Sequence, residues 1–151
     1  MKIAIIGSTG MVGREILRVI SERELKFDSL FLVASEKSVG KSVVFQDSEH
    51  TIIDINTCLN LQPDLIIFSA GSELSLSYAP KFAKIGATVI DNSSAWRMDN
   101  SKKLIIPEIN GHVLNPNDKI IANPNCSTIQ MLMAINPIHK KYKIDKIIVS
   151  T

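Results

Sequence analysis

The chain has 151 residues, of which 45% are hydrophobic and 21% are charged, a composition typical of a globular domain with a core of its own. Its net charge of +2 and its 5% of aromatic residues give no basis for nucleic-acid binding or for attraction to an anionic membrane. The two cysteines, Cys58 and Cys126, form no CxxC pair, and the three histidines show no metal-ligand spacing. We therefore expect a cytoplasmic protein without a disulfide framework, a metal site, a transmembrane helix or a nucleic-acid partner.

The chain opens with a strand, a glycine loop and a helix. Residues 2–6 form a short apolar run typical of a buried parallel strand, and GSTGMVG follows at residues 7–13. Residues 11–23 have helical periodicity. Four apolar residues are predicted to share the buried face of this helix: Val12, Ile16, Val19 and Ile20. This order is typical of a dinucleotide-binding unit, in which the early glycines let the backbone approach a pyrophosphate and the last lets the helix pack closely.

A second strand, predicted at residues 29–34, leads into the segment SEKSVGK at residues 35–41. The end of this strand usually meets the adenosine ribose of a dinucleotide. Glu36 could bind a ribose 2′-hydroxyl, which would indicate NAD. Lys37 and Ser38 could instead hold a 2′-phosphate, which would indicate NADP. The residues alone leave both cofactors open.

The middle of the chain continues the alternation of strands and helices. Further strands or extended segments are predicted at residues 43–45, 51–55, 63–71, 87–91, 104–110 and 119–122. A helix is predicted at residues 74–85, with Ser72 as its N-cap and Pro80 interrupting its middle. The alternation predicts an α/β fold with a doubly wound, Rossmann-like parallel sheet and helices on both faces.

The loop NSSAWRM, at residues 92–98, contains an arginine just beyond a predicted strand end. The planar guanidinium of Arg97 is suited to bind a phosphate or a carboxylate through two parallel hydrogen bonds. A solvated surface arginine is an equally good interpretation of the sequence.

The stretch NPNCST, at residues 123–128, places Cys126 where an apolar helix is predicted to begin. Unpaired N–H groups at a helix N-terminus favour a thiolate, which is a nucleophile. Asn125 is placed to donate an amide hydrogen bond to an oxyanion, whereas a small buried cysteine is the alternative. The helix is predicted over residues 127–135, restarting at Pro137 and running to residue 142, and a strand is predicted at residues 144–150.

Four motifs, taken in order, resemble the N-terminal part of the aspartate-semialdehyde dehydrogenase family over essentially the whole chain. They are GSTGMVG (7–13), NSSAWRM (92–98), PEIN (107–110) and NPNCST (123–128). The resemblance implies NADPH-dependent reduction of aspartyl phosphate to aspartate semialdehyde and phosphate through a cysteine thioester. That reaction lies on the route to diaminopimelate, lysine, methionine and threonine. The resemblance also implies a homodimer for the full-length enzyme.

The same resemblance implies a role for each matching residue. Cys126 matches the nucleophile, Asn125 the neighbour that stabilises the oxyanion, and Arg97 the arginine that binds the substrate phosphate. The residues that match the cofactor site are Gly7, Thr9, Gly10, Met11, Val12, Gly13, Ser35, Lys37, Ser38 and Ser72. The family's usual A-S-x-R-S-x-G is here ASEKSVG, so Lys37 replaces an arginine. Lysine loses the planar fork of arginine but keeps its positive charge, and this charge favours NADP.

The resemblance further implies a dinucleotide-binding domain at residues 1–125. Residues 126–151 would then be the first helix and strand of a truncated catalytic and dimerisation domain. The family takes its base from a histidine in that second domain, so the isolated chain is expected to be inactive. Apolar side chains facing the missing domain are expected to be exposed: Leu132, Ile135, Ile147 and Val149.

Two other functions remain open. One is a nucleotide-binding module in which Cys126 is only a core residue. The other is an enzyme like N-acetylglutamyl-phosphate reductase, which shares the architecture but has different residues around its cysteine. Residues 123–128 weigh against this second alternative.

Overall fold

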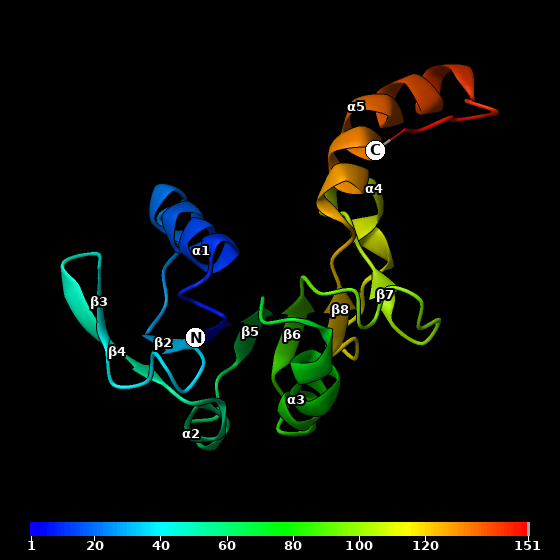
Figure 1. Ribbon diagram of the computed structural model, residues 1–151. Helices are drawn as coiled ribbons and strands as arrows, with labels where there is room; N and C mark the ends of the chain where they lie inside the picture. Colours follow the sequence, from blue (N-terminus) through cyan, green and yellow to red (C-terminus); the bar gives the residue numbers. More distant parts are fainter. Residues whose placement is uncertain (151) are drawn as a thin grey trace.

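The computed structural model describes residues 1–150, and its centre is an eight-stranded sheet (Figure 1). The strands are β1 (Lys2–Ile6), β2 (Ser29–Val33), β3 (Ser42–Phe45), β4 (Ser48–Ile53), β5 (Leu65–Phe68), β6 (Thr88–Asp91), β7 (Lys103–Leu104) and β8 (Ile120–Ala122). Their order across the sheet is β3-β4-β2-β1-β5-β6-β8-β7. The pairings are parallel except for the β3–β4 hairpin at one edge.

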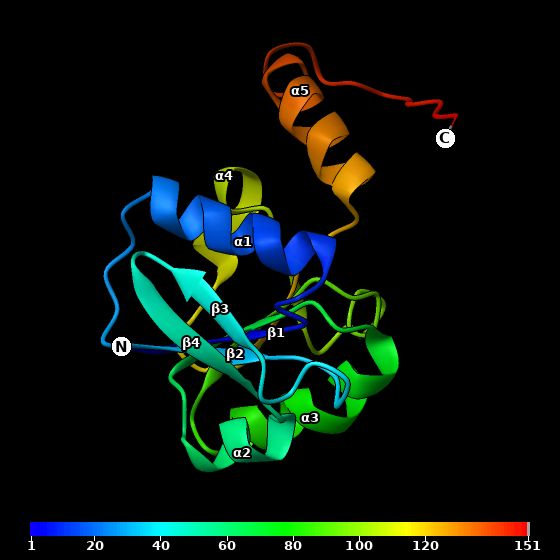
Figure 2. The ribbon, with the colours of Figure 1, turned by 60° about the vertical axis from the view of Figure 1, so that its left-hand side comes forward.

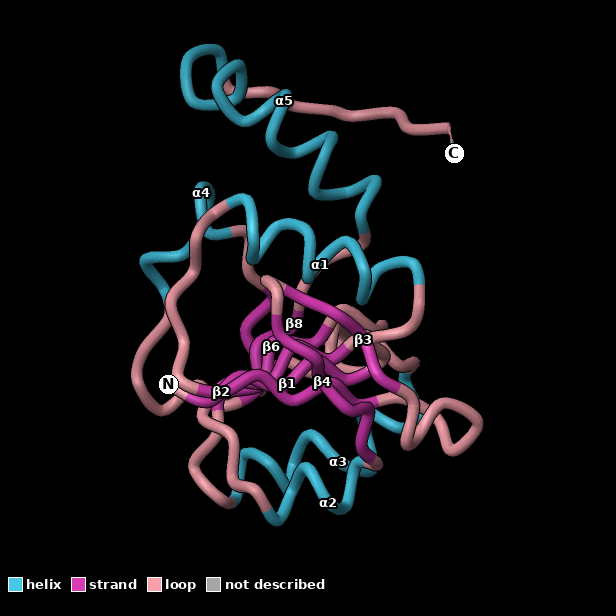
Figure 3. Tube along the Cα trace, turned by 90° about the vertical axis from the view of Figure 1, so that its left-hand side faces the viewer, coloured by secondary structure: helices cyan, strands magenta, loops and turns pink. Residues whose placement is uncertain are grey.

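Helices cover both faces of this sheet, as predicted. They are α1 (Met11–Glu22), α2 (Ile55–Asn60), α3 (Ser72–Lys84), α4 (Pro107–Asn110), the 3-10 helix η1 (Gly111–Val113) and α5 (Cys126–Tyr142). Figures 2 and 3 show α1 on one face and α2 with α3 on the other. Within residues 1–150, none of the helices has the length and apolar character that a membrane crossing requires.

The core consists of two apolar layers, one on each side of the sheet. Ile3 and Ile5 of β1 pack towards Leu17 and Ile20 of α1. The alternate residues of β1 pack in the layer that α2 and α3 cover, together with Phe82. Successive side chains of a strand point to opposite faces, so a strand covered on both sides must be apolar throughout. This explains why β1 could be recognised from its continuous apolar run.

The buried face of α1 differs from the predicted one. Gly13, Leu17 and Ile20 are buried, whereas Val12 and Val19 are 50% and 40% exposed. The prediction for these two valines was wrong. The physical reason is the close packing of Gly13 against the loop after β1, which fixes the rotation of the helix about its axis.

Two predictions about the middle helices also need correction. Ser72 is the first residue of α3 and not its N-cap, because Gly71 occupies the N-cap without a side-chain hydrogen bond. Pro80 lies inside this continuous helix. Residues 107–110, predicted to be extended, form the short helix α4, in which Pro107 occupies the first turn. The Asn110 side chain stabilises this turn by accepting the Ile106 N–H at 2.8 Å.

The C-terminal part projects from the sheet (Figures 1 and 3). Helix α5 runs without a break through Pro137, so the predicted restart there was wrong, and none of its residues is buried. The strand predicted at residues 144–150 is also wrong, because no strand among residues 1–150 pairs with this segment. Ile147 and Val149 are 48% and 54% exposed, as predicted. Leu132 and Ile135, which were also predicted to be exposed, are instead half-buried, and they line a hollow together with Ile144 and Ile147.

Candidate functional site

A cleft of about 800 Å³ opens at the carboxyl edge of the sheet, where β1, β2 and β5 end. The chain passes from β1 to β2 and β4 on one side, then returns to β5 and β6 on the other. Ligands of doubly wound sheets bind at such a switch point. Five of the ten residues predicted for the cofactor site line this cleft: Gly7, Thr9, Gly10, Ser35 and Lys37.

Two glycines make the floor of the cleft possible. Gly7 has φ +89°, and a Cβ added there would lie 2.3 Å from the carbonyl oxygen of Ser69. At Gly13 a Cβ would lie 2.3 Å from the carbonyl oxygen of Gly7 and 2.7 Å from Cα of Ser8. The loop after β1 therefore touches both the loop after β5 and the first turn of α1. Gly13 is buried beneath the loop and does not line the cleft.

The N-terminus of α1 has features that suit anion binding. Its N-cap, Gly10, makes no side-chain cap, and no acidic residue lies in the first turn. The first N–H groups of a helix have no partner within the helix, so they are donors for a phosphate. Met11 and Val12 lie in this turn with exposed side chains. Their possible contribution to phosphate binding is through their backbone N–H groups. A pyrophosphate fits this glycine-lined helix end.

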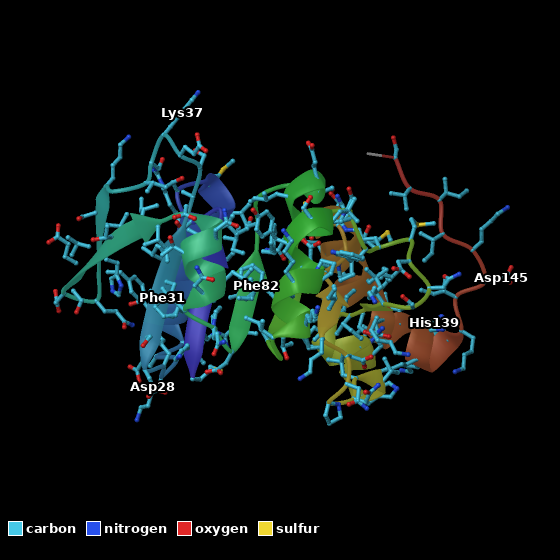
Figure 4. The ribbon with its side chains drawn as sticks, turned by 90° about the horizontal axis from the view of Figure 1, so that it is seen from below. Asp28, Phe31, Lys37, Phe82, His139 and Asp145 are labelled. Atoms are coloured by element: carbon cyan, nitrogen blue, oxygen red, sulfur yellow. The ribbon has the colours of Figure 1, made fainter. Side chains whose placement is uncertain are left out.

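The end of β2 forms the other side of the cleft. Glu36 and Lys37 both line it, so the structure keeps both candidate contacts for a 2′-substituent. Figure 4 shows Lys37 extending from this loop into solvent. Ser38 does not line the cleft, and its N–H donates to the carbonyl of Ser35 at 2.8 Å in a turn. Ser72 also lies outside the lining, with its hydroxyl 3.0 Å from that of Ser94.

Four polar residues of the cleft were missed in the sequence: Asp54, Asn56, Ser69 and Tyr78. Asp54 is the N-cap of α2 and accepts the Thr57 hydroxyl at 2.5 Å, the Asn56 N–H at 2.9 Å and the Thr57 N–H at 3.0 Å. The Thr57 hydroxyl, followed by these backbone donors, lowers the pKa of Asp54. Tyr78 donates to the Asn56 amide oxygen at 3.0 Å and so links α3 to α2. An Asp directly after an apolar strand is an N-cap signal that could have revealed α2.

Arg97 bridges the ends of two neighbouring strands. Its Nε donates to the carbonyl of Asn123 at 3.0 Å, and its Nη2 donates to the carbonyl of Asn92 at 2.9 Å. The side chains of the two asparagines are joined at 2.8 Å. The partly buried guanidinium is therefore held by the protein and is not a freely solvated surface arginine. It keeps further N–H donors for a ligand, since a guanidinium has five.

Cys126 is the first residue of α5, and it is exposed. Asn125 is the N-cap, and its amide oxygen accepts the Ser127 N–H at 3.0 Å, which leaves the amide nitrogen as a donor. By contrast, Cys58 is buried in the core, where desolvation and then Asp54 raise the pKa of its thiol to about 12. The exposure of Cys126 contradicts the alternative in which it is a core residue.

The histidines offer no base beside Cys126 in the part of the chain that the structure describes. His139 lies thirteen residues further along α5, which is roughly 20 Å at the rise of an α-helix. Figure 4 shows it far from Lys37, near the end of the chain with Asp145. His50 is on β4, separated from β8 by four strands. His112 is exposed on η1 and makes no hydrogen bond to residues 123–128.

The sheet order and the glycine-lined cleft define a Rossmann-type dinucleotide-binding domain. The model of the family described as semialdehyde dehydrogenase, NAD-binding domain, matches residues 2–116. This match covers well over half of the chain, so the protein belongs to that family.

Curated relatives and solved structures agree with this assignment. The chain is 48% identical to aspartate-semialdehyde dehydrogenase of Aquifex aeolicus, over 99% of this chain and 45% of the relative. It is 42% identical to the Bacillus subtilis enzyme of the same name, over 100% of this chain and 44% of the relative. A crystal structure of aspartate semialdehyde dehydrogenase II from Vibrio cholerae superposes with a TM-score of 0.89 at 44% identity, covering 95% of this chain and 47% of that one. The chain thus spans somewhat under half the length of these relatives.

Proposed function

We propose that this chain supplies the cofactor site and the nucleophile of an aspartate-semialdehyde dehydrogenase. The observation that carries the proposal is the bond from Arg97 to the Asn123 carbonyl, three residues before the exposed Cys126. Arg97 and Cys126 thus follow strands that end at the same carboxyl edge of the sheet as the dinucleotide cleft, which supports their roles as phosphate-binding cation and nucleophile. The names of the relatives support aspartyl phosphate and aspartate semialdehyde as the substrate pair.

The chemistry follows from these three groups. The thiolate of Cys126 attacks the acyl carbon of aspartyl phosphate, the S–C bond forms and phosphate leaves. Arg97 holds the phosphate, and the amide nitrogen of Asn125 donates to the oxyanion. A reduced nicotinamide dinucleotide held by the first turn of α1 and the end of β2 would supply the hydride that converts the thioester to the aldehyde, with release of the Cys126 thiolate.

We propose that the remaining parts of the site come from the rest of the enzyme. Residues 1–125 would form the cofactor domain, and residues 126–151 would begin a catalytic and dimerisation domain that supplies the base. The proposal rests on the span of the match, which is 45% and 44% of the two relatives above. It includes a homodimer and a cytoplasmic location for the full-length enzyme.

For the cofactor we propose NADP, with Lys37 on the 2′-phosphate and the first turn of α1 on the pyrophosphate. The test is titration of the 151-residue chain with NADPH and NADH, followed by the fluorescence of the reduced nicotinamide. A charge-assisted hydrogen bond contributes about 1.5–3 kcal/mol, so Lys37→Met should weaken NADPH binding roughly 10- to 100-fold and leave NADH binding nearly unchanged.

Lys41→Met is the matched control, because Lys41 is exposed in the same segment and does not line the cleft. It should leave binding of both nucleotides unchanged. Tighter binding of NADH than of NADPH by the unaltered chain would contradict the NADP proposal and would favour Glu36 as the ribose contact.

A further inference from the structure

We propose that Asp91 is a positioning residue, which fixes the loop of residues 92–97 and thereby sets the Arg97 guanidinium at the strand end that leads to Cys126. The inference rests on the proposed function, in which Arg97 binds the phosphate that leaves as the thioester forms. It adds a residue that no motif pointed to, at the end of β6 and directly before the loop.

Asp91 is 0% exposed, and its carboxylate is fully used by the loop and by α3. It accepts the Ser93 N–H at 2.7 Å, the Ser93 hydroxyl at 2.8 Å and the Ser75 hydroxyl at 2.5 Å. A buried carboxylate is costly unless such donors compensate for lost hydration. Asp91 also forms no ion pair among the described residues. The carboxylate fixes the positions of the groups that donate to it, which an apolar side chain could not do.

These bonds hold both halves of the loop. Ser93, fixed by Asp91, accepts the Ala95 N–H at 3.1 Å on its hydroxyl. Ser75, which donates to Asp91, accepts the indole N–H of Trp96 at 2.8 Å. The chain from Asp91 through Ser75 thus ends on the residue directly before Arg97.

The same residue also secures the two carbonyls that hold the guanidinium. Asn92, whose carbonyl accepts from Arg97, follows Asp91 directly in the chain. The backbone carbonyl of Asp91 accepts the Asn123 N–H at 2.8 Å, and Asn123 offers the second carbonyl to Arg97. Asn123 is three residues before Cys126, so the Cα atoms of these two residues lie no more than about 11 Å apart. The position of Arg97 relative to Cys126 is therefore set from Asp91.

The chain itself provides a matched control. Asp99 accepts the Ser101 N–H at 2.8 Å and the Ser101 hydroxyl at 2.7 Å, the same pattern that Asp91 makes with Ser93. The Asp99 side chain makes no bond to Ser75 or Trp96, and only the Asp99 backbone N–H, which the substitution keeps, donates to the Trp96 carbonyl at 3.2 Å. Asp91→Asn and Asp99→Asn thus change the same local motif in the same way, and only the first should alter the position of the arginine.

The test is the rate of alkylation of Cys126 by anionic iodoacetate divided by its rate with neutral iodoacetamide, followed by peptide mass spectrometry on the 151-residue chain. The ratio cancels the reactivity of the thiol and reports a nearby positive charge. An exposed charge pair contributes 0.2–1 kcal/mol, so Arg97→Met should lower the ratio by up to roughly fivefold. Asp91→Asn should lower it nearly as far, and Asp99→Asn should leave it unchanged.

Folding is checked in each variant by cooperative urea unfolding and by continued protection of the buried Cys58. If Asp91→Asn does not fold, Trp96→Phe tests the same relay, because it keeps an aromatic ring but lacks the indole N–H that donates to Ser75, and it should also lower the ratio. If Arg97→Met lowers the ratio and Asp91→Asn leaves it unchanged, the positioning role alone is overturned. Trp96→Phe takes the place of Asp91→Asn in this comparison if Asp91→Asn does not fold. A ratio unchanged in Arg97→Met would overturn both this role and the arginine of the proposed function.

Discussion

At the scale of single residues, the loop after β1 is defined by contacts that leave no room for a side chain. Gly13 meets backbone atoms of Gly7 and Ser8, which cannot move away as the end of a flexible side chain could. The third glycine of the motif therefore packs α1 against the loop, and the phosphate-binding geometry depends on it indirectly.

Gly13→Ala should lower the free energy of unfolding by about 1–3 kcal/mol, the usual cost of overpacking, and should weaken NADPH binding. Urea unfolding and nucleotide titration measure the two effects. Gly111→Ala is the control, because a Cβ at Gly111 would have Pro107 Cβ at 3.8 Å as its nearest contact. Equal stability of the two variants would contradict the packing role of Gly13.

Candidate site residues could be named from the sequence where they share one short motif. The glycines of the loop, Arg97 and Cys126 could all be named from local sequence. Asp91 could not, because its partner Ser75 is 16 residues away and only folding brings the two together. Val12 and Val19 were assigned to the wrong face of α1 because periodicity gives the spacing of a stripe and leaves its direction to tertiary contacts.

At the scale of elements, the strands were recognised and the short helices were missed. The central strands are covered on both faces, so their continuous apolar runs distinguish them from amphipathic segments. Helices α2 and α4 have 6 and 4 residues, too few for helical periodicity to appear. The sequence of residues 144–150 predicts a strand, yet a strand forms only where a neighbour can pair with it.

Helix α2 offers a pH test of its N-cap. The Thr57 hydroxyl, followed by backbone donors, lowers the pKa of Asp54 in the folded chain. The charged form is therefore favoured in the folded state, which stabilises the protein above the unfolded pKa of about 3.9. This contribution is lost as the pH falls through the lower folded pKa.

Asp54→Asn should consequently reduce the free energy of unfolding more at pH 7 than at pH 3, measured in urea at both values. Asp47→Asn corrects for the loss of one negative charge, since Asp47 lies in the turn between β3 and β4. The capping role would be contradicted if the loss of unfolding free energy caused by Asp54→Asn were larger at pH 3 than at pH 7.

At the scale of the whole molecule, the projecting α5 and the segment after it leave apolar surface uncovered. Exposed apolar patches of this kind promote association. The 151-residue chain should therefore self-associate as its concentration rises, as measured by sedimentation velocity. The pair Ile147→Asp and Val149→Asp should shift it towards monomer, because both side chains are about half exposed, at 48% and 54%. A monomer at all concentrations would contradict this expectation.

The most direct test of the proposed function is the detection of an aspartyl thioester on Cys126. The 151-residue chain is mixed with aspartyl phosphate without nucleotide at about pH 9, where a thiol ionises without the base that the rest of the enzyme would supply. The reaction is quenched in acid, the protein is digested, and the mass of the peptide containing Cys126 is measured. We predict an aspartyl adduct that hydroxylamine removes, present in the unaltered chain, absent in Cys126→Ser and reduced in Arg97→Met. An unmodified Cys126 peptide in the unaltered chain, or an equal adduct in Cys126→Ser, would contradict the assignment of this cysteine as the nucleophile.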